Sequence, residues 1–212
     1  MTWAILYIGV VVCHLLACFF GKWPLRAGTK IFLIPLLILS ATWKNGAPLP
    51  PLLLTTLLFG WLGDLALLFR GKKWSLPLGI VFFAIGHGLY IPLLLTGSPL
   101  PRFFPNVLLI LLAIGFLGFF ISRTILSKFQ SILQKFALFY MLLILSMVAA
   151  ALCRFFGEIR IDTLLCAFGA ILFGVSDSIL SADFYDKPNN KRSFVVMLTY
   201  ISAQTFLTFG LL

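Results

Sequence analysis

The feature that most constrains this chain is a succession of apolar runs, each about long enough to cross a lipid bilayer. Hydrophobic residues make up 61% of the 212 residues and charged residues only 10%, and the mean hydropathy is +1.10. A soluble domain carries roughly 25% charged residues, whereas a spanning helix needs about 20 mainly apolar residues. Eight runs qualify, at residues 3–20, 30–43, 52–69, 76–95, 106–121, 132–152, 163–182 and 193–212. The sequence predicts an all-α polytopic membrane protein, with eight transmembrane helices in one bundle and a single domain over residues 1–212.

The distribution of positive charge predicts the orientation of these helices. Counting Lys30 and Lys135, in the first turns of their runs, with the loops that precede them, Lys and Arg number 12 in the odd loops and 4 in the even loops. The positive-inside rule then places the odd loops in the cytoplasm and both termini outside. The net charge of +10 therefore indicates membrane topology and not nucleic-acid binding. The first run lacks a basic leader and a small-residue cleavage site, so we expect it to remain as a mature helix. We expect the lipid bilayer as partner, either the bacterial cytoplasmic membrane or, in a eukaryote, the endoplasmic reticulum.

Two aspartates lie inside apolar runs, where an ionisable group is costly and usually functional. Asp64 falls in the third run and Asp177 in the seventh, whereas the other four acidic residues lie in short polar connections. Both runs head toward the cytoplasm in the predicted orientation. Each aspartate would then lie about 9 Å from that boundary, at about 1.5 Å per helical residue. The pair predicts a functional site, with a structural lock between helices as the alternative.

Helical spacing places small and polar residues on shared faces of three runs. The expected inward faces are Gly60, Gly63, Asp64 and Leu67 in the third run, Gly79, Phe83, Gly86, His87 and Tyr90 in the fourth, and Gly174, Asp177, Ser178 and Ser181 in the seventh. Small residues beside a polar group let helices approach closely. Lys30 is expected to open the second run on the cytoplasmic side, and Tyr200 and Gln204 lie one turn apart on the last run. The pattern predicts a polar pocket inside the bundle, open toward the cytoplasmic leaflet.

Simpler roles are open for several of these residues. His87 could bridge two helices, His14 is expected to pack, and Lys30 could anchor the helix at the interface with a snorkelling stem. A zinc site would need three or four ligands, which Asp64, Asp177 and the two histidines could only just supply. No paired-histidine or cysteine spacing supports such a site, so no metal or other cofactor is expected. The four cysteines are expected to be small apolar packing residues.

Four short motifs follow one another along the chain. They are Leu62-Gly63-Asp64-x-x-Leu67, Gly86-His87-x-x-Tyr90, Phe173-x-x-Ser176-Asp177-Ser178 and Thr199-Tyr200-x-x-x-Gln204. In this order and spacing the chain resembles the YhhN family, the lysoplasmalogenases, over nearly its whole length. It departs from the family in the second run, where a proline is expected soon after the lysine and Pro35 comes five residues after Lys30.

The resemblance implies hydrolysis of the vinyl ether bond of lysoplasmalogens, giving a fatty aldehyde and glycerophosphocholine or glycerophosphoethanolamine. Asp64 and Asp177 would be the catalytic residues, one protonating the outer alkene carbon and the other assisting attack by water. Burial and a like-charged neighbour favour the protonated form of one carboxyl group, while the other stays ionised. The sequence leaves open which aspartate takes which role. The implied supporting or substrate-binding residues are His87, Tyr90, Ser176, Ser178, Tyr200, Gln204 and Lys30, the last of these near the lipid phosphate.

Two other classes of function fit the same aspartates. One is a metal-dependent lipid amidase or esterase of the alkaline-ceramidase type. The other is a proton-coupled transporter, which would be expected to have spans interrupted by Gly and Pro in corresponding halves. The runs that carry Asp64 and Asp177 contain Gly but no Pro, which favours an enzyme over a transporter. For the enzyme that the resemblance implies, the expected partner is a lysophospholipid substrate. The sequence does not determine the oligomeric state.

Overall fold

The computed structural model describes residues 2–69, 71–96, 105, 115, 132–182 and 189–212. These residues form seven helices: α1 (Thr2–Phe19), α2 (Trp23–Asn45), α3 (Pro51–Leu68), α4 (Ser75–Leu95), α6 (Ile132–Gly157), α7 (Ile161–Ala182) and α8 (Asn190–Gly210). All seven are long and apolar enough to cross a membrane, as in a multi-pass membrane protein. The fifth predicted run, residues 106–121, lies almost entirely outside the described residues, so the count of eight spans stays a prediction.

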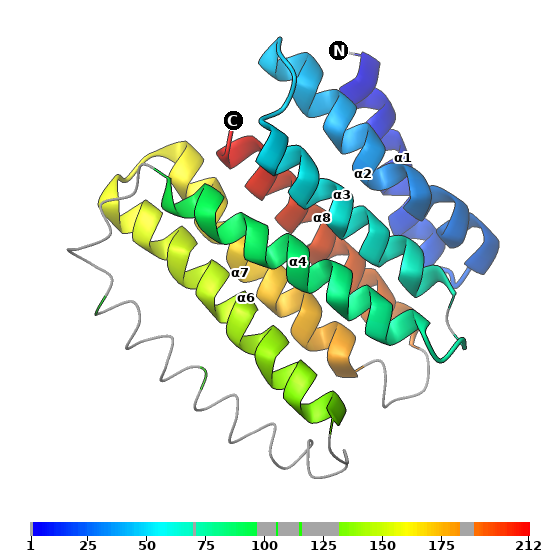
Figure 1. Cartoon of the computed structure of the whole chain (residues 1–212). Coiled ribbons are helices and arrows are strands. Elements are labelled where there is room, and N and C mark those ends of the chain that lie inside the picture. The colour runs from blue at the N-terminus through cyan, green and yellow to red at the C-terminus, as the bar shows by residue number, and fades with distance from the viewer. Residues whose placement is uncertain (1, 70, 97–104, 106–114, 116–131, 183–188) are drawn as a thin grey trace.

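The helices follow one another around the bundle in chain order (Figure 1). Each helix packs on the next, from α1 to α4 and from α6 to α8, and α4 packs on α6. The C-terminal α8 closes the arrangement through contacts with α1 and α2. Of the seven helices α8 is the most enclosed, with 56% of its span buried against 22% for α1. Side chains from several other helices can therefore meet on α8.

Helix α2 begins at Trp23, seven residues before the start predicted from hydropathy. Pro24 sits in the first turn, where its missing N–H costs nothing and its fixed φ suits a helix. The helix ends where Gly46 adopts a φ of 68° and its N–H donates to the Thr42 carbonyl. Lys30 consequently lies two turns inside α2 and is 8% exposed. The prediction that Lys30 opens this span was wrong. The segment before Lys30 contains charged residues and was therefore left out of the apolar run, but it is helical.

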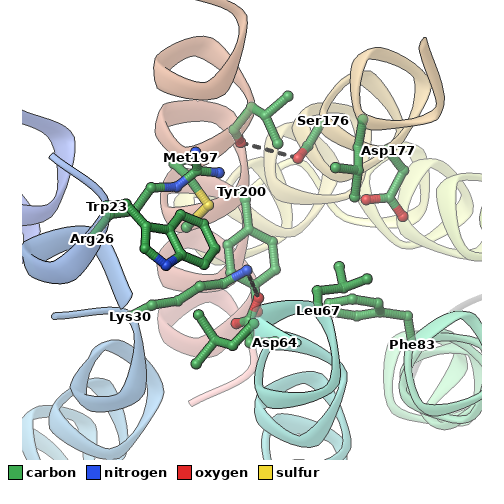
Figure 2. Close-up of a pocket in the computed structure, with 13 residues that line it drawn as sticks. Trp23, Arg26, Lys30, Asp64, Leu67, Phe83, Ser176, Asp177, Met197 and Tyr200 are labelled. Carbon is green, nitrogen blue, oxygen red and sulfur yellow. Dashed lines mark hydrogen bonds and ion pairs between the residues drawn. The ribbon is translucent and has the colours of Figure 1, made fainter. Parts of the chain in front are cut away.

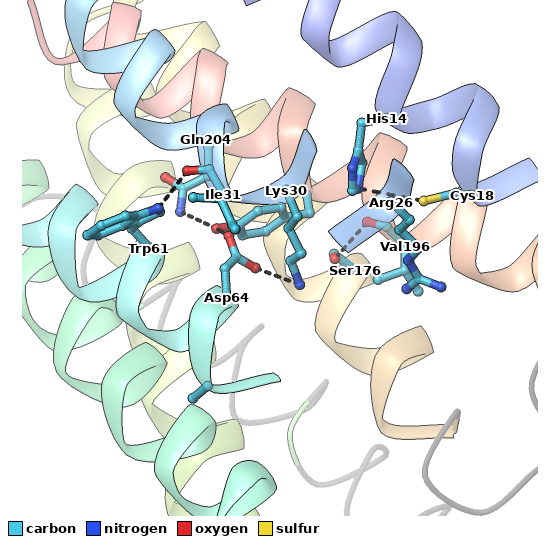
Figure 3. Close-up of polar contacts among 12 residues, drawn as sticks. His14, Cys18, Arg26, Lys30, Ile31, Trp61, Asp64, Ser176, Val196 and Gln204 are labelled. Atoms are coloured by element: carbon cyan, nitrogen blue, oxygen red, sulfur yellow. Dashed lines mark hydrogen bonds and ion pairs between the residues drawn. The ribbon is translucent and has the colours of Figure 1, made fainter. Parts of the chain in front are cut away.

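A proline inside α2 fixes how that helix is aligned with α3. Pro35 has no N–H, so the Ile31 carbonyl one turn earlier lacks its helical donor. The indole Nε1 of Trp61 on α3 donates to this carbonyl at 2.8 Å (Figure 3). Because Ile31 follows Lys30 directly and Trp61 precedes Asp64 by three residues, the bond helps to hold Lys30 opposite Asp64.

Glycines permit the close approach of the helices that carry the polar residues. A Cβ atom added to Gly63 on α3 would lie 2.8 Å from the Phe83 ring on α4. On α7, a Cβ atom added to Gly169 would lie 3.0 Å from the Ala203 carbonyl on α8. Such contacts are shorter than van der Waals distance, so these two interfaces require glycine.

The inward faces predicted for the third and fourth runs are confirmed. The buried residues include Gly60, Gly63, Asp64 and Leu67 on α3, and Gly79, Phe83, Gly86, His87 and Tyr90 on α4. On α7 the predicted face was wrong at Ser178, which is exposed and donates to the Gly174 carbonyl of its own helix at 2.7 Å. The buried face passes instead through Ala170, Phe173 and Ser176, because α7 packs between α6 and α8. The side chain of Ser181 lies outside the described residues.

Candidate active site

A pocket lies inside the bundle and contains both of the aspartates (Figure 2). Its walls come from α2, α3, α4, α7 and α8, and they include Lys30, Asp64, Ser176, Asp177 and Tyr200. The cavity volume is about 30 Å³, which is room for roughly two water molecules. The two residues that the sequence singled out, 113 positions apart, therefore meet at one cavity.

Asp64 is held by a cation and a phenol. Lys30 Nζ lies 2.9 Å from Asp64 Oδ1, and the two side chains are only 10% and 3% exposed. On the other oxygen, Tyr200 Oη donates to Asp64 Oδ2 at 2.6 Å. A carboxylate has about four lone-pair positions, so Asp64 keeps acceptor capacity toward the pocket.

A chain of hydrogen bonds extends from Asp64 across the bundle core. Tyr90 Oη on α4 donates to Gln204 Oε1 at 2.8 Å, and Gln204 Nε2 donates to Tyr200 Oη at 3.5 Å. A Cβ atom added to Gly60 would lie 3.0 Å from that Gln204 nitrogen, so a larger residue at this position of α3 would press on the amide. All three polar side chains are buried, which fixes the phenol of Tyr200 relative to Asp64.

Asp177 lies beside a phenol and an imidazole, where Asp64 has a lysine. Tyr140 Oη of α6 donates a hydrogen bond to Asp177 Oδ2. His87 Nε2 lies 3.9 Å from the same oxygen, which is too long for a hydrogen bond. Within the described residues, no Lys or Arg pairs with Asp177. The two aspartates therefore have different partners although they share one cavity.

The imidazole of His87 has its tautomer fixed by its own helix. His87 Nδ1 lies 2.6 Å from the Phe83 carbonyl, and because a carbonyl only accepts, Nδ1 must carry the proton. When the ring is neutral it has a lone pair on Nε2, an atom that is buried and has no hydrogen-bond partner among the described residues. Ring contacts with Tyr140 and Phe173, both edge to face, hold the imidazole in this position. An acceptor thus faces the carboxyl group of Asp177.

The serines of the third motif lie in different places. Ser176 lines the pocket, is buried and donates to the Val196 carbonyl at 3.1 Å, which ties α7 to α8. Ser178 is exposed and does not line the pocket. The structure therefore brings Lys30, Asp64, Ser176, Asp177 and Tyr200 to the cavity wall. His87, Tyr90 and Gln204 stand behind this wall.

His14 belongs to a separate contact between α1 and α2. Its Nδ1 lies 2.8 Å from Thr29 Oγ1, and its Nε2 lies 3.6 Å from Cys18 Sγ. Among the described residues, no group of three or more His, Cys, Asp or Glu side chains is arranged to hold a metal ion. Three of the four cysteines are buried, and Cys13 is exposed.

Among the aromatic and charged residues of the site, sequence reasoning missed Tyr140, Trp23 and Arg26. Tyr140, which touches Asp177, is the one tyrosine of its apolar run, and that hydroxyl was the available signal. Trp23 and Arg26 also line the pocket (Figure 2). They were missed because the polar start of α2 was interpreted as a loop.

The match to a family model described as the YhhN family covers residues 25–211. The chain belongs to the YhhN family. No curated protein and no solved structure matches the chain. The YhhN match includes every residue that lines the pocket except Trp23.

Proposed function

We propose that this YhhN protein is an eight-span lysoplasmalogenase, a membrane hydrolase that cleaves the vinyl ether bond of lysoplasmalogens. The observation that carries the proposal is the pair of aspartates at one cavity, of which Asp64 pairs with Lys30 and Asp177 has no Lys or Arg partner among the described residues. Vinyl ether hydrolysis needs a proton donor to carbon and a negative charge for the resulting cation. Two carboxyl groups in unlike surroundings supply both functions.

The contacts favour Asp177 as the acid and Asp64 as the carboxylate. Each carboxyl group accepts a hydrogen bond from a tyrosine, so the difference lies in the cation: Asp64 has a buried ammonium group at 2.9 Å, which stabilises its negative charge. Asp177 faces the lone pair of His87 Nε2, which would repel a carboxylate. The same lone pair could accept a hydrogen bond from a carboxylic acid once a small side-chain movement closes the 3.9 Å distance between the two atoms.

The proposed reaction begins when Asp177 donates its proton to the outer alkene carbon. The alkene electrons form the new C–H bond, and positive charge spreads over the inner carbon and the ether oxygen, where the carboxylate of Asp64 stabilises it. Water adds to the inner carbon and gives a proton to Asp64, forming a hemiacetal. Asp64 then returns this proton to the glycerol oxygen as the C–O bond breaks. The hemiacetal hydroxyl gives its proton to Asp177, which restores both residues and releases the aldehyde.

The supporting residues have definite tasks in this scheme. Tyr200, held by Gln204 and Tyr90, keeps the Asp64 carboxylate in one orientation. Tyr140 and His87 keep the carboxyl group of Asp177 in one orientation. We further propose the orientation predicted from the loop charges, in which the pocket opens toward the cytoplasmic leaflet.

Purified protein incubated with a lysoplasmalogen and, separately, with an acyl lysolipid tests the proposal. Aldehyde release from the first substrate alone is the expected result. Asp64→Asn and Asp177→Asn should each abolish turnover, and the double variant should be little worse than either single variant, because residues that act as a unit are not additive. Ser178→Ala is the matched control, since Ser178 lies on the same helix outside the pocket. Near-normal turnover in either asparagine variant would exclude the paired-carboxyl mechanism.

A further inference from the structure

Arg26 lines the pocket one helical turn before Lys30 on α2. Its Nη1 donates to Ser193 Oγ on α8 at 3.1 Å, and its guanidinium carbon lies 5.8 Å from the centre of the Trp23 ring. Ser193 itself is 5% exposed, so the anchor is buried although the arginine is only half-buried. The guanidinium group is thus held in place at the wall of the pocket (Figure 2).

The two cations of the pocket differ in what they already bind. The charge of Lys30 is matched by Asp64 at 2.9 Å. Among the described residues, no carboxylate pairs with Arg26. A guanidinium group has further N–H donors beyond the one used by Ser193, arranged to bind two oxygens of a phosphate at once. Arg26 is therefore the cation of this wall that remains available to an anion.

The location of Arg26 also suits an anion. Arg26 lies in the first turn of α2 and Ser193 in the first turn of α8, and the N-terminal end of a helix carries partial positive charge. Arg26 lies about 6 Å along the helix from Lys30, at about 1.5 Å per residue. In a lysoplasmalogen, the glycerol backbone separates the phosphate from the vinyl ether by a comparable, short distance. A lipid with its ether at the aspartates would place its phosphate near Arg26.

We propose that Arg26 binds the phosphate of the lysolipid head group, with Ser193 as its positioning residue, and that this contact selects phosphate-bearing ether lipids over neutral alkenylglycerols. Lys30, in contrast, serves Asp64. The inference rests on the proposed function for the identity of the lipid. The binding contact itself needs no turnover, so the two can fail separately.

The test measures binding of two non-cleavable lipids, 1-alkyl-glycerophosphocholine and 1-alkylglycerol, to the full chain in nanodiscs by calorimetry. Arg26→Gln should weaken binding of the phosphate-bearing lipid about tenfold, as expected for loss of a charge-assisted hydrogen bond, and leave 1-alkylglycerol unchanged. Arg26→Lys should retain part of the affinity, because it keeps the charge but loses the planar pair of donors. Lys22→Gln is the control, since Lys22 is an exposed cation at the same end of α2 and does not line the pocket.

Three outcomes would overturn the inference. The first is that Arg26→Gln weakens both lipids equally, and the second is that it weakens neither. The third is that inorganic phosphate alone binds the wild-type protein as tightly as the lipid, which would make this a site for free phosphate. If binding depends on Arg26 as expected but no lysoplasmalogen is cleaved, the proposed hydrolase function fails while the phosphate site stands.

Discussion

The ion pair between Lys30 and Asp64 gives a quantitative test of the site. Lys30→Met removes the cation and keeps the length of the side chain, which leaves the Asp64 carboxylate buried with Tyr200 as its donor. Exposed ion pairs contribute about 0–1 kcal/mol, whereas removing one partner of a buried pair costs about 3–5 kcal/mol. The side chains of Lys30 and Asp64 are 10% and 3% exposed, so this is a buried ion pair. Because Tyr200 still donates to Asp64, we expect the lower end, a loss of about 3 kcal/mol.

The double variant Lys30→Met with Asp64→Asn decides whether this loss comes from the uncompensated charge. Asp64→Asn alone strands the ammonium group and should also cost about 3 kcal/mol. The double variant buries no charge, and the amide oxygen of asparagine can still accept from Tyr200 Oη. It should therefore lie within about 1 kcal/mol of the wild type, far from the sum of about 6 kcal/mol for independent sites.

Unfolding by SDS in mixed micelles measures these free energies without relying on enzymatic turnover. If the single variants do not fold and the double variant does, the conclusion is the same. The reasoning is refuted if Lys30→Met costs less than about 1 kcal/mol, the value of an exposed pair, or if the double variant loses the sum of the two single losses.

Three further predictions concern the helix interface, the chemistry and the topology. Gly60→Ala should lower turnover while the protein still folds, because its Cβ would press on the Gln204 amide from 3.0 Å, whereas Gly9→Ala, with no atom within 4 Å, should have no effect. Protein treated with a chelator should keep full turnover, and stoichiometric zinc whose removal ends turnover would favour a metal-dependent hydrolase instead. In a cysteine-free background, a cysteine that replaces Lys73 should react only with reagents that reach the cytoplasm, and a cysteine appended after Leu212 should react only with reagents added outside. The reverse labelling pattern would move the pocket to the other leaflet.

The sequence alone predicted a multi-pass helical membrane protein and singled out the two aspartates of the candidate site. Insertion of a helix depends on hydropathy summed along about 20 consecutive residues, a local property that can be read directly. The same logic singled out Asp64 and Asp177, because a carboxyl group inside an apolar run needs compensation wherever the helix lies in the bundle. The shared faces of α3 and α4 followed from helical periodicity.

The tertiary structure decided which partner each of these residues has. Lys30 reaches Asp64, Tyr140 reaches Asp177 and Arg26 reaches Ser193 across interfaces between different helices. Such contacts depend on the rotation and the vertical alignment of whole helices, which close packing at glycines and long-range hydrogen bonds determine. The hydropathy of a run carries no information about the rotation of its helix or about its vertical alignment. For that reason the sequence identified two equivalent aspartates, and only the packing of the bundle paired Asp64 with a lysine and Asp177 with the tyrosine of α6.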